Sequence, residues 1–269
     1  MDIASNQKLP TCVVVTFVWR ELTHKEKVFL GNNMMKLQDF PFVVMHPKRF
    51  DVTHILSLRS EVTEIALDDR WFESVASYNE MMKSPWFYKL FGDYDFLLVC
   101  QIDAYILENQ LSEWCLKGYD YVGAPWLAND NLYENTLGRL VRSAMKHLPM
   151  RESKIHSYHL YHEVGNGGLS LRRVNSMIDI LERNQHLVEC SKGKHSVQED
   201  VFISFLIGKN DGLRIPDWRE ALYFSYEKAP AKALELTNGR MPFGFHDTNS
   251  KYWDSFWSLH VSLDNTYGL

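Results

Sequence analysis

The residues best suited to do chemistry in this chain are acids and a histidine that lie next to apolar segments. Asp103 comes just after the apolar run 96–100, FLLVC, and is separated from it by Gln101 and Ile102. A continuous apolar run is typical of a strand buried on both faces of a mostly parallel sheet. An acid that follows such a strand lies at the carboxyl edge of the sheet, where open α/β folds bind ligands. Asp103 is a carboxylate of the kind that Mg²⁺ or Mn²⁺ prefers, and the alternative is a turn or capping role.

A glycine-rich segment, Gly165-Asn166-Gly167-Gly168, is a second candidate. Its glycines allow the backbone to approach a ligand closely, and its main-chain N–H groups could meet an anion. No Lys-Ser or Lys-Thr pair follows, and the segment leads into a strand-like stretch, so it is not a nucleotide phosphate loop. A plain tight turn is the alternative.

Two adjacent acids, Glu199 and Asp200, precede the apolar residues of segment 201–203. A carboxylate there could take the proton from an attacking hydroxyl as a general base, and neighbouring acids raise one another's pKa. Acids at the start of a helix also stabilise its dipole without any catalytic role. His246 ends the turned apolar stretch 242–246, and a neutral imidazole is a common metal ligand, although a packed histidine is the alternative.

The elements that must position these residues alternate between strands and helices in the first half of the chain. Strands are predicted over 11–17, 42–45 and 96–100, and helices over 19–37 and 71–91, the latter with a break at Ser84-Pro85. This order predicts parallel strands with right-handed crossovers. The secondary structure of segment 55–67 is ambiguous from the sequence. The second half is less regular, with expected elements at 111–117 (helix), 119–126 (strand and turn), 137–147 (helix within an insertion, 129–151), 164–171 (strand), 174–189 (helix) and 199–206.

Composition excludes several classes of protein. The 269 residues are 45% hydrophobic and 23% charged, as in ordinary globular domains, and the net charge of −5 argues against nucleic-acid binding. The four cysteines have no C-x-x-C spacing and are expected to be reduced, which suits the cytoplasm. No signal peptide, membrane span, internal repeat or G-x-S-x-G elbow is found, so we expect one soluble domain and no serine hydrolase.

The order of the motifs carries a resemblance. A strand followed by an acid, then VGAPW (122–126), GNGGLSLR (165–172), EDVF (199–202) and PFGFH (242–246), resembles a family of bacterial proteins known only as an uncharacterised domain. That family is similar to nucleotide-sugar glycosyltransferases of GT-A fold and occurs among genes for surface polysaccharides such as capsule or O-antigen. The resemblance spans Val13 to His246. It implies an α/β single domain with a mixed, mostly parallel central sheet flanked by helices, in which about 11–107 bind the nucleotide and 108–269 the acceptor.

The resemblance also implies roles for particular residues. Asp103 and His246 would hold a divalent ion, Mn²⁺ or Mg²⁺, and Gln101 stands where the first acid of the D-x-D motif is found, which leaves it a ribose or water contact. Asp200, with Glu199 as the second choice, would be the base of an inverting transfer. Further residues would bind the donor (Val15, Thr16, Asn79, Asn166, Gly167, Gly168), and Trp126 would contact the acceptor.

The function implied is transfer of a sugar from a nucleotide diphosphate sugar, with a UDP-sugar favoured, to a glycan or lipid-linked glycan. A cytoplasmic protein with peripheral contact at the inner membrane face is expected, and Arg139, Arg142 and Lys146 could touch the acceptor or that surface. Because Gln101 replaces an acid, a protein of the same fold that binds nucleotide sugars or carbohydrate without turnover is the alternative.

Overall fold

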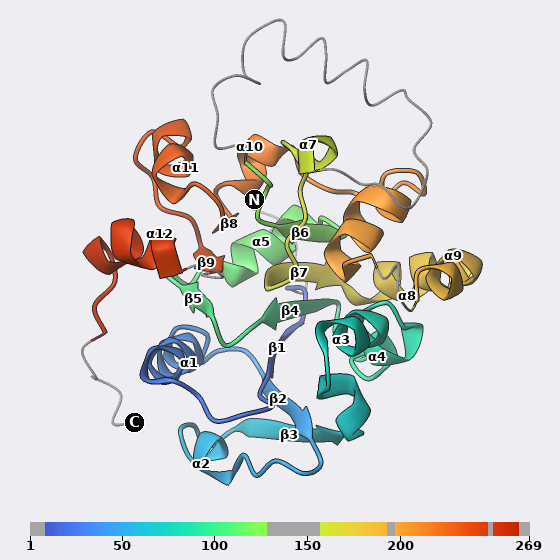
Figure 1. Cartoon of the computed structure of the whole chain (residues 1–269), viewed down its shortest axis with the longest axis horizontal. Helices are drawn as coiled ribbons and strands as arrows, with labels where there is room; N and C mark the ends of the chain where they lie inside the picture. The colour runs from blue at the N-terminus through green and yellow to red at the C-terminus, as the bar shows by residue number, and fades with distance from the viewer. Residues whose placement is uncertain (1–8, 128–156, 193–196, 247–249, 264–269) are drawn as a thin grey trace, which may run out of the picture.

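Four parallel strands form the centre of the molecule in the computed structural model, which describes residues 9–127, 157–192, 197–246 and 250–263. The six-stranded sheet has the order β3-β2-β1-β4-β7-β6, in which β7 runs antiparallel to both β4 and β6. A second sheet, β5-β9-β8, has three strands. The fold is therefore mixed α/β with a mostly parallel central sheet, as the sequence predicts (Figure 1).

The bounds of the strands are β1 Cys12–Phe17, β2 Phe42–Pro47, β3 Val62–Leu67, β4 Phe96–Cys100, β5 Ala104–Ile106, β6 Tyr121–Gly123, β7 Leu169–Arg173, β8 Ser225–Tyr226 and β9 Gly244–His246. The helices before β7 are α1 His24–Lys36, α2 Thr53–Leu56, η1 Asp69–Phe72, α3 Val75–Met82, α4 Pro85–Lys89, α5 Leu111–Lys117 and α7 Ser157–Leu160. Those after it are α8 Val174–Arg183, α9 Gln185–Cys190, η4 Val201–Gly208, α10 Trp218–Ala221, α11 Pro230–Leu236, α12 Ser250–Ser255 and η5 Trp257–Leu259.

The alternation of side chains along β1 explains the layers. Cys12 and Val14 lie in one apolar cluster with residues of α1, α2 and α5, whereas Val13 and Val15 lie in another with residues of α3, α4 and α8. Successive side chains of a strand point to opposite faces of the sheet. A strand covered by helices on both faces needs apolar residues at every position, and this is why the run CVVVTF has so few polar residues.

The ambiguous segment 55–67 contains both the end of α2 and the whole of β3, separated by a turn. Strand β3 lies at the edge of the sheet and none of its residues is fully buried, so its apolar pattern is too sparse to identify it from sequence. The predicted helix over 71–91 is three helical pieces, η1, α3 and α4, and α4 starts at Pro85, where the break was expected. The predicted helix 137–147, with Arg139, Arg142 and Lys146, lies outside the described residues.

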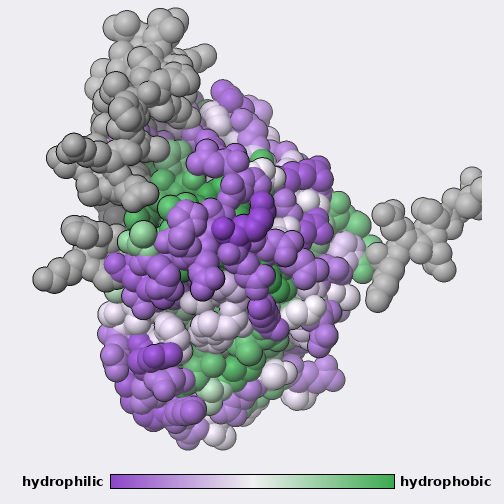
Figure 2. All heavy atoms as spheres, turned by 90° about the vertical axis from the view of Figure 1, so that its right-hand side faces the viewer, coloured by the Kyte–Doolittle hydropathy of each residue, from purple (hydrophilic) through white to green (hydrophobic). Residues whose placement is uncertain are grey.

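The face that carries α3, α4 and α9 is mainly hydrophilic, with smaller hydrophobic areas between the polar ones (Figure 2). Helix α3 has a buried side at Asn79, Met81 and Met82, whereas Val75 at its start is 71% exposed. Among the described helices, none has the length and apolar character needed to cross a membrane.

Candidate active site

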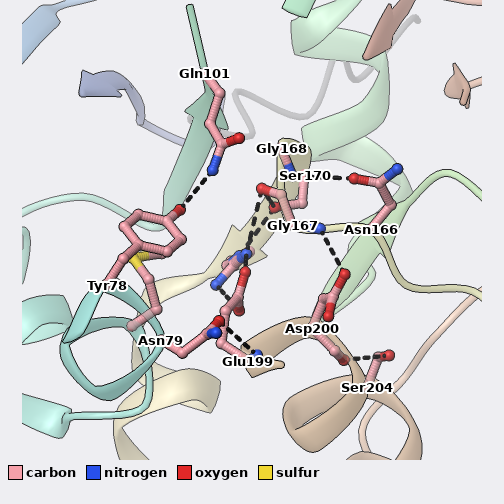
Figure 3. Close-up of polar contacts among 12 residues, drawn as sticks. Tyr78, Asn79, Gln101, Asn166, Gly167, Gly168, Ser170, Glu199, Asp200 and Ser204 are labelled. Atoms are coloured by element: carbon pink, nitrogen blue, oxygen red, sulfur yellow. Dashed lines mark hydrogen bonds and ion pairs between the residues drawn. The ribbon is translucent and has the colours of Figure 1, made fainter. Parts of the chain in front are cut away.

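A pocket of about 540 Å³ opens where β1 and β4 end. One of its walls is aromatic and comes from the end of β1 and from the η1–α3 segment (Phe17, Trp19, Trp71, Phe72, Tyr78). The other wall is polar and comes from the loop 166–168, from segment 198–200, and from Glu227 and His246. Figure 3 shows Tyr78 and Asn79 of α3 on one side and Asn166, Gly167 and Asp200 on the other. The carboxyl edge of the sheet is therefore where the pocket lies, as expected for an open α/β fold.

Asp103 and His246 meet although 143 residues separate them. Strand β5 pairs with β9 so that Ala104 lies opposite His246, and this register brings the preceding Asp103 to the imidazole. His246 Nε2 lies 3.1 Å from Asp103 Oδ1. Burial alone would raise the pKa of Asp103, but His246 lowers it by its charge and hydrogen bond, with a net lowering. Burial lowers the pKa of His246, but Asp103 more than offsets this, so the net direction is upward.

The Asp103–His246 pair fits a divalent ion. Two ligand atoms that bind one Mg²⁺ at about 2.1 Å and at right angles lie about 3 Å apart, close to the separation seen here. The lowered pKa of Asp103 and the raised pKa of His246 describe a charged pair, so an ion bound here would displace the proton of His246. In the part of the chain that the structure describes, no three His, Cys, Asp or Glu side chains gather around one point. The remaining ligands would therefore come from water or from a bound substrate, as is common for Mg²⁺.

The glycine-rich loop joins this pair to the acidic segment. A Cβ on Gly168 would lie 2.2 Å from His246 Cε1, and a Cβ on Gly167 would lie 1.9 Å from Glu199 Oε1. Both positions therefore require glycine because of close approach. Asn166 has φ 57°, in the left-handed region that asparagine tolerates, and its Oδ1 accepts a hydrogen bond from Gly168 N–H. Its Nδ2 is buried and has no hydrogen-bond partner.

Glu199 is held by an internal cation. Arg172 Nη1 and Nη2 each donate to one carboxylate oxygen of Glu199 at 2.8 Å, and Arg172 is fully buried. Asn79 Oδ1 accepts a hydrogen bond from Glu199 N–H, so this predicted donor residue also holds the acidic segment. A bidentate pair with a buried guanidinium engages both carboxylate oxygens, which indicates a structural role for Glu199.

Asp200 has a different environment from its neighbour. Its Oδ1 accepts a hydrogen bond from Val201 N–H and its Oδ2 accepts one from Gly167 N–H, at 2.7 and 3.2 Å. Burial, followed by the Glu199 charge, raises the pKa of Asp200 to about 7, although the two backbone hydrogen bonds act in the lowering direction. A general base is most effective when its pKa lies near the working pH.

Gln101 lies at the edge of the same pocket and is fixed by a tyrosine. Its Nε2 donates to the hydroxyl of Tyr78 at 2.9 Å (Figure 3). The amide oxygen of Gln101 is then directed away from Tyr78. Burial raises the pKa of the Tyr78 hydroxyl well above its ordinary value, so this hydroxyl remains a neutral partner.

Four of the predicted site residues do not line the pocket: Val15, Thr16, Trp126 and Asp103, whose partner His246 does line it. Val15 packs in the apolar cluster beneath α3 and α4, and Thr16 is 1% exposed. The pocket instead starts one residue further on, at Phe17, because β1 is still covered on both faces at Thr16. Trp126 is buried against Gly165, where a Cβ would lie 1.7 Å from its ring, and this packing explains its position without an acceptor.

Three residues that sequence reasoning missed belong to the site or its support: Tyr78, Arg172 and Glu227. Tyr78 lies on the buried side of an expected helix, and Arg172 lies within the quoted motif GNGGLSLR, so each looked like an ordinary part of its element. Glu227 follows β8, a two-residue strand too short to produce a pattern. The one signal available was an arginine in a predicted strand segment, because a charge that such a strand buries needs a partner.

The fold places the chain among the GT-A glycosyltransferase folds. The galactosyltransferase LgtC, solved in complex with donor and acceptor sugar analogs, matches with a TM-score of 0.51 at 12% identity over 88% of this chain and 87% of that one. The bifunctional glycosyltransferase WbbM, in its apo form, matches with a TM-score of 0.54 at 12% identity over 89% of this chain. The matched part is 46% of the WbbM chain. At these identities the likeness establishes the fold.

The chain belongs to the family described as "Protein of unknown function (DUF5672)", which matches residues 61–246. The matched region extends from the turn before β3 to the end of β9, and so contains Asp103, the glycine-rich loop, Asp200 and His246. No curated protein has a matching sequence.

Proposed function

We propose that this protein transfers a sugar from a nucleotide diphosphate sugar to a hydroxyl group of a glycan or lipid-linked glycan. The observation that carries the proposal is the loop 166–168, which contacts Asp200 through Gly167 N–H and packs Gly168 against His246. A candidate base and a candidate metal pair are thus held on the two sides of one short loop. A UDP-sugar donor and a role in bacterial surface polysaccharide synthesis follow from the family resemblance alone.

The reaction needs one proton acceptor and one place for negative charge. Asp200 takes the proton of the acceptor hydroxyl. The oxygen of that hydroxyl forms the new bond to the anomeric carbon, and the bond from that carbon to the diphosphate oxygen breaks. The attack and departure on opposite faces invert the anomeric centre. Asp103 and His246 would hold Mn²⁺ or Mg²⁺, which offsets the charge that builds on the leaving diphosphate.

The charge of the pocket supports metal dependence. The described residues that line it include Glu73, Glu199, Asp200 and Glu227 but neither lysine nor arginine, and only Glu199 has a buried guanidinium partner. A diphosphate that enters this pocket meets like charge. Like charges at close range cost several kcal/mol, so a cation must accompany the diphosphate.

Donor hydrolysis and sugar transfer, measured with UDP-, GDP-, CMP- and TDP-sugars with and without Mn²⁺, test the proposal. We expect one donor to be turned over in the presence of Mn²⁺, and Asp103→Ala to abolish the turnover. Asp93→Ala, which removes an exposed carboxylate before β4, is the matched control and should retain activity. Selective binding of a nucleotide sugar without turnover would instead identify a non-catalytic binding protein.

A further inference from the structure

Three polar groups in the active pocket have no hydrogen-bond partner within the described structure: Nδ1 of His246, which belongs to the candidate metal pair, and one group each of Glu227 and Asn166. Glu227 follows β8 in the small sheet and lines the pocket, and its Oε2 is buried without a hydrogen bond. Asn166, which is 3% exposed, lines the same pocket with an unpartnered Nδ2. The carboxylate of Glu227 accepts a hydrogen bond, and the amide nitrogen of Asn166 donates one. A buried polar group left unpaired costs about 1–3 kcal/mol, so both call for a ligand that supplies the missing hydrogen bonds.

The position of Glu227 relates it to the donor sugar. It lines the same pocket as Asp200 and His246, and its negative charge acts on both. In the proposed reaction, the hydroxyl that Asp200 deprotonates attacks the anomeric carbon of the donor sugar. The same carbon is bonded to the diphosphate, which is bound beside His246. The donor sugar therefore lies between these two residues, and a group close to both lies beside that sugar.

Glu227 is separate from the metal pair. Asp103 Oδ1 and His246 Nε2 are in contact, but among the described side chains no third acid joins them in a cluster able to hold an ion. The carboxylate of Glu227 thus remains available to accept hydrogen bonds from sugar hydroxyls. Beside it the polar wall carries Asp200, and no lysine or arginine is found among the described residues that line the pocket.

We propose that Glu227, with Asn166, binds the hydroxyl groups of the donor sugar and makes the pocket select neutral sugars over uronic acids. A neutral hexose can donate a hydroxyl to Glu227 Oε2 and accept from Asn166 Nδ2. A uronic acid brings a carboxylate next to Glu227, where the described pocket lining has no lysine or arginine to balance it, and this like-charge contact is unfavourable. The inference rests on the proposed function and names the class of sugar that the site accepts.

The test compares matched donor pairs, UDP-glucose with UDP-glucuronic acid and UDP-galactose with UDP-galacturonic acid, in transfer and in binding by calorimetry with Mn²⁺. We expect the wild type to favour the neutral member by about 100-fold, equal to about 3 kcal/mol. Glu227→Gln keeps the shape and should narrow this ratio at least about tenfold. Glu235→Gln, an exposed acid on neighbouring α11, should leave the ratio unchanged.

Asn166→Gly gives a second measurement, because glycine adopts the same positive φ and lacks the amide. It should remove the extra affinity of the UDP-sugar over UDP and leave the affinity for UDP itself unchanged. An unchanged neutral-to-uronic ratio in Glu227→Gln, while the wild type still turns over a neutral donor, overturns the inference and leaves the proposed function intact. A higher Mn²⁺ requirement with an unchanged ratio also overturns it, since Glu227 would then be a metal ligand. Absence of binding and turnover with every donor overturns both.

Discussion

The neighbouring carboxylates of Glu199 and Asp200 differ in chemistry because their surroundings differ. Glu199 is paired with the buried guanidinium of Arg172, whereas Asp200 is left with two backbone N–H groups and the repulsion of Glu199. Two adjacent acids in different environments can take different roles, one structural and one catalytic. The same ion pair that stabilises Glu199 therefore keeps a negative charge next to Asp200 and raises its pKa.

The pKa of Asp200, raised to about 7, predicts opposite pH dependences for activity and stability. Activity needs the ionised form, so kcat/KM should fall about tenfold per pH unit below pH 7 and level off above it. The stability of the fold has the opposite pH dependence, because the folded state favours the protonated form of Asp200. A carboxyl group with a folded pKa of about 7 and an unfolded pKa of about 4 contributes stability that is fully present below pH 4 and lost as pH rises through 7, about 4 kcal/mol in all.

Asp200→Asn should therefore reduce kcat by at least about 100-fold and raise the free energy of unfolding at pH 8 by about 1–3 kcal/mol. The stability gain should shrink toward pH 4, where the wild-type carboxyl is protonated in both states. Urea unfolding at pH 4, 6 and 8, together with a kcat/KM profile, measures both effects. A wild-type profile that is flat from pH 6 to 8 contradicts the assignment of Asp200 as the base.

Gly168 is predicted to be essential because of its contact with His246. In Gly168→Ala the new Cβ would lie 2.2 Å from His246 Cε1, so the imidazole or the loop must move. We expect a loss of about 1–3 kcal/mol in stability, typical of overpacking, and weaker Mn²⁺ binding by calorimetry. Gly92→Ala is the control, since its Cβ would meet only a carbonyl oxygen at 3.4 Å. Equal Mn²⁺ affinity in wild type and Gly168→Ala contradicts the placement of His246 in the metal site.

For single residues, the sequence predicted which side chains could do chemistry better than it predicted which side chains they contact. Asp103 and His246 were expected to act together, and the structure places them in contact. The sequence could not show that Glu199 is paired with a buried arginine, because its partner Arg172 lies 27 residues away on a strand whose pairing had to be known first. Thr16 and Trp126 were chosen by position in a motif, but burial decides their exposure to a ligand, and burial depends on the whole fold.

At the scale of elements, Arg172 links β7, α4 and the acidic segment. Its five N–H donors are used by Ser170, Tyr88, Glu199 and the carbonyl of Gly167, so no donor is left unpaired. Ser170 also donates to the Gly167 carbonyl. The backbone of Gly167 is thus held at its carbonyl by this network while its N–H donates to Asp200.

Arg172→Met should consequently destabilise the protein by about 3–5 kcal/mol, because it leaves the Glu199 carboxylate buried and unpaired. The double variant Arg172→Met with Glu199→Gln should recover part of this loss, since no unpaired buried charge remains. Lys192→Met breaks an exposed pair with Glu189 and should cost at most about 1 kcal/mol. Urea unfolding of the wild type, the two single variants and the double variant measures these differences in the free energy of unfolding. If Arg172→Met costs no more than Lys192→Met, the network does not support the loop.

Helices and strands with a strong apolar pattern in the sequence were predicted well, and those without such a pattern were not. Strands β1, β2 and β4 are covered on both faces, so their apolar runs identify them. The apolar run VFISFLIG forms the π-helix η4, and its length and composition alone do not distinguish a buried helix from a strand. Strands β8 and β9 have two and three residues, and the small sheet exists only because distant segments meet.

At the scale of the molecule, the two sheets meet at Asp103, which lies between β4 of the large sheet and β5 of the small one. A metal ion bound by Asp103 and His246 would join the end of β4 to β9. Binding to the folded state alone stabilises it by about 2.7 kcal/mol at an ion concentration 100 times Kd. We therefore expect Mn²⁺ to slow amide hydrogen exchange in β5 and β9 more than in β2, which lies far from the site in the sheet order. Asp103→Asn and EDTA should each remove the effect, while Asp93→Ala should keep it. Equal slowing across both sheets, or slowing that persists in Asp103→Asn, would show that the ion binds elsewhere.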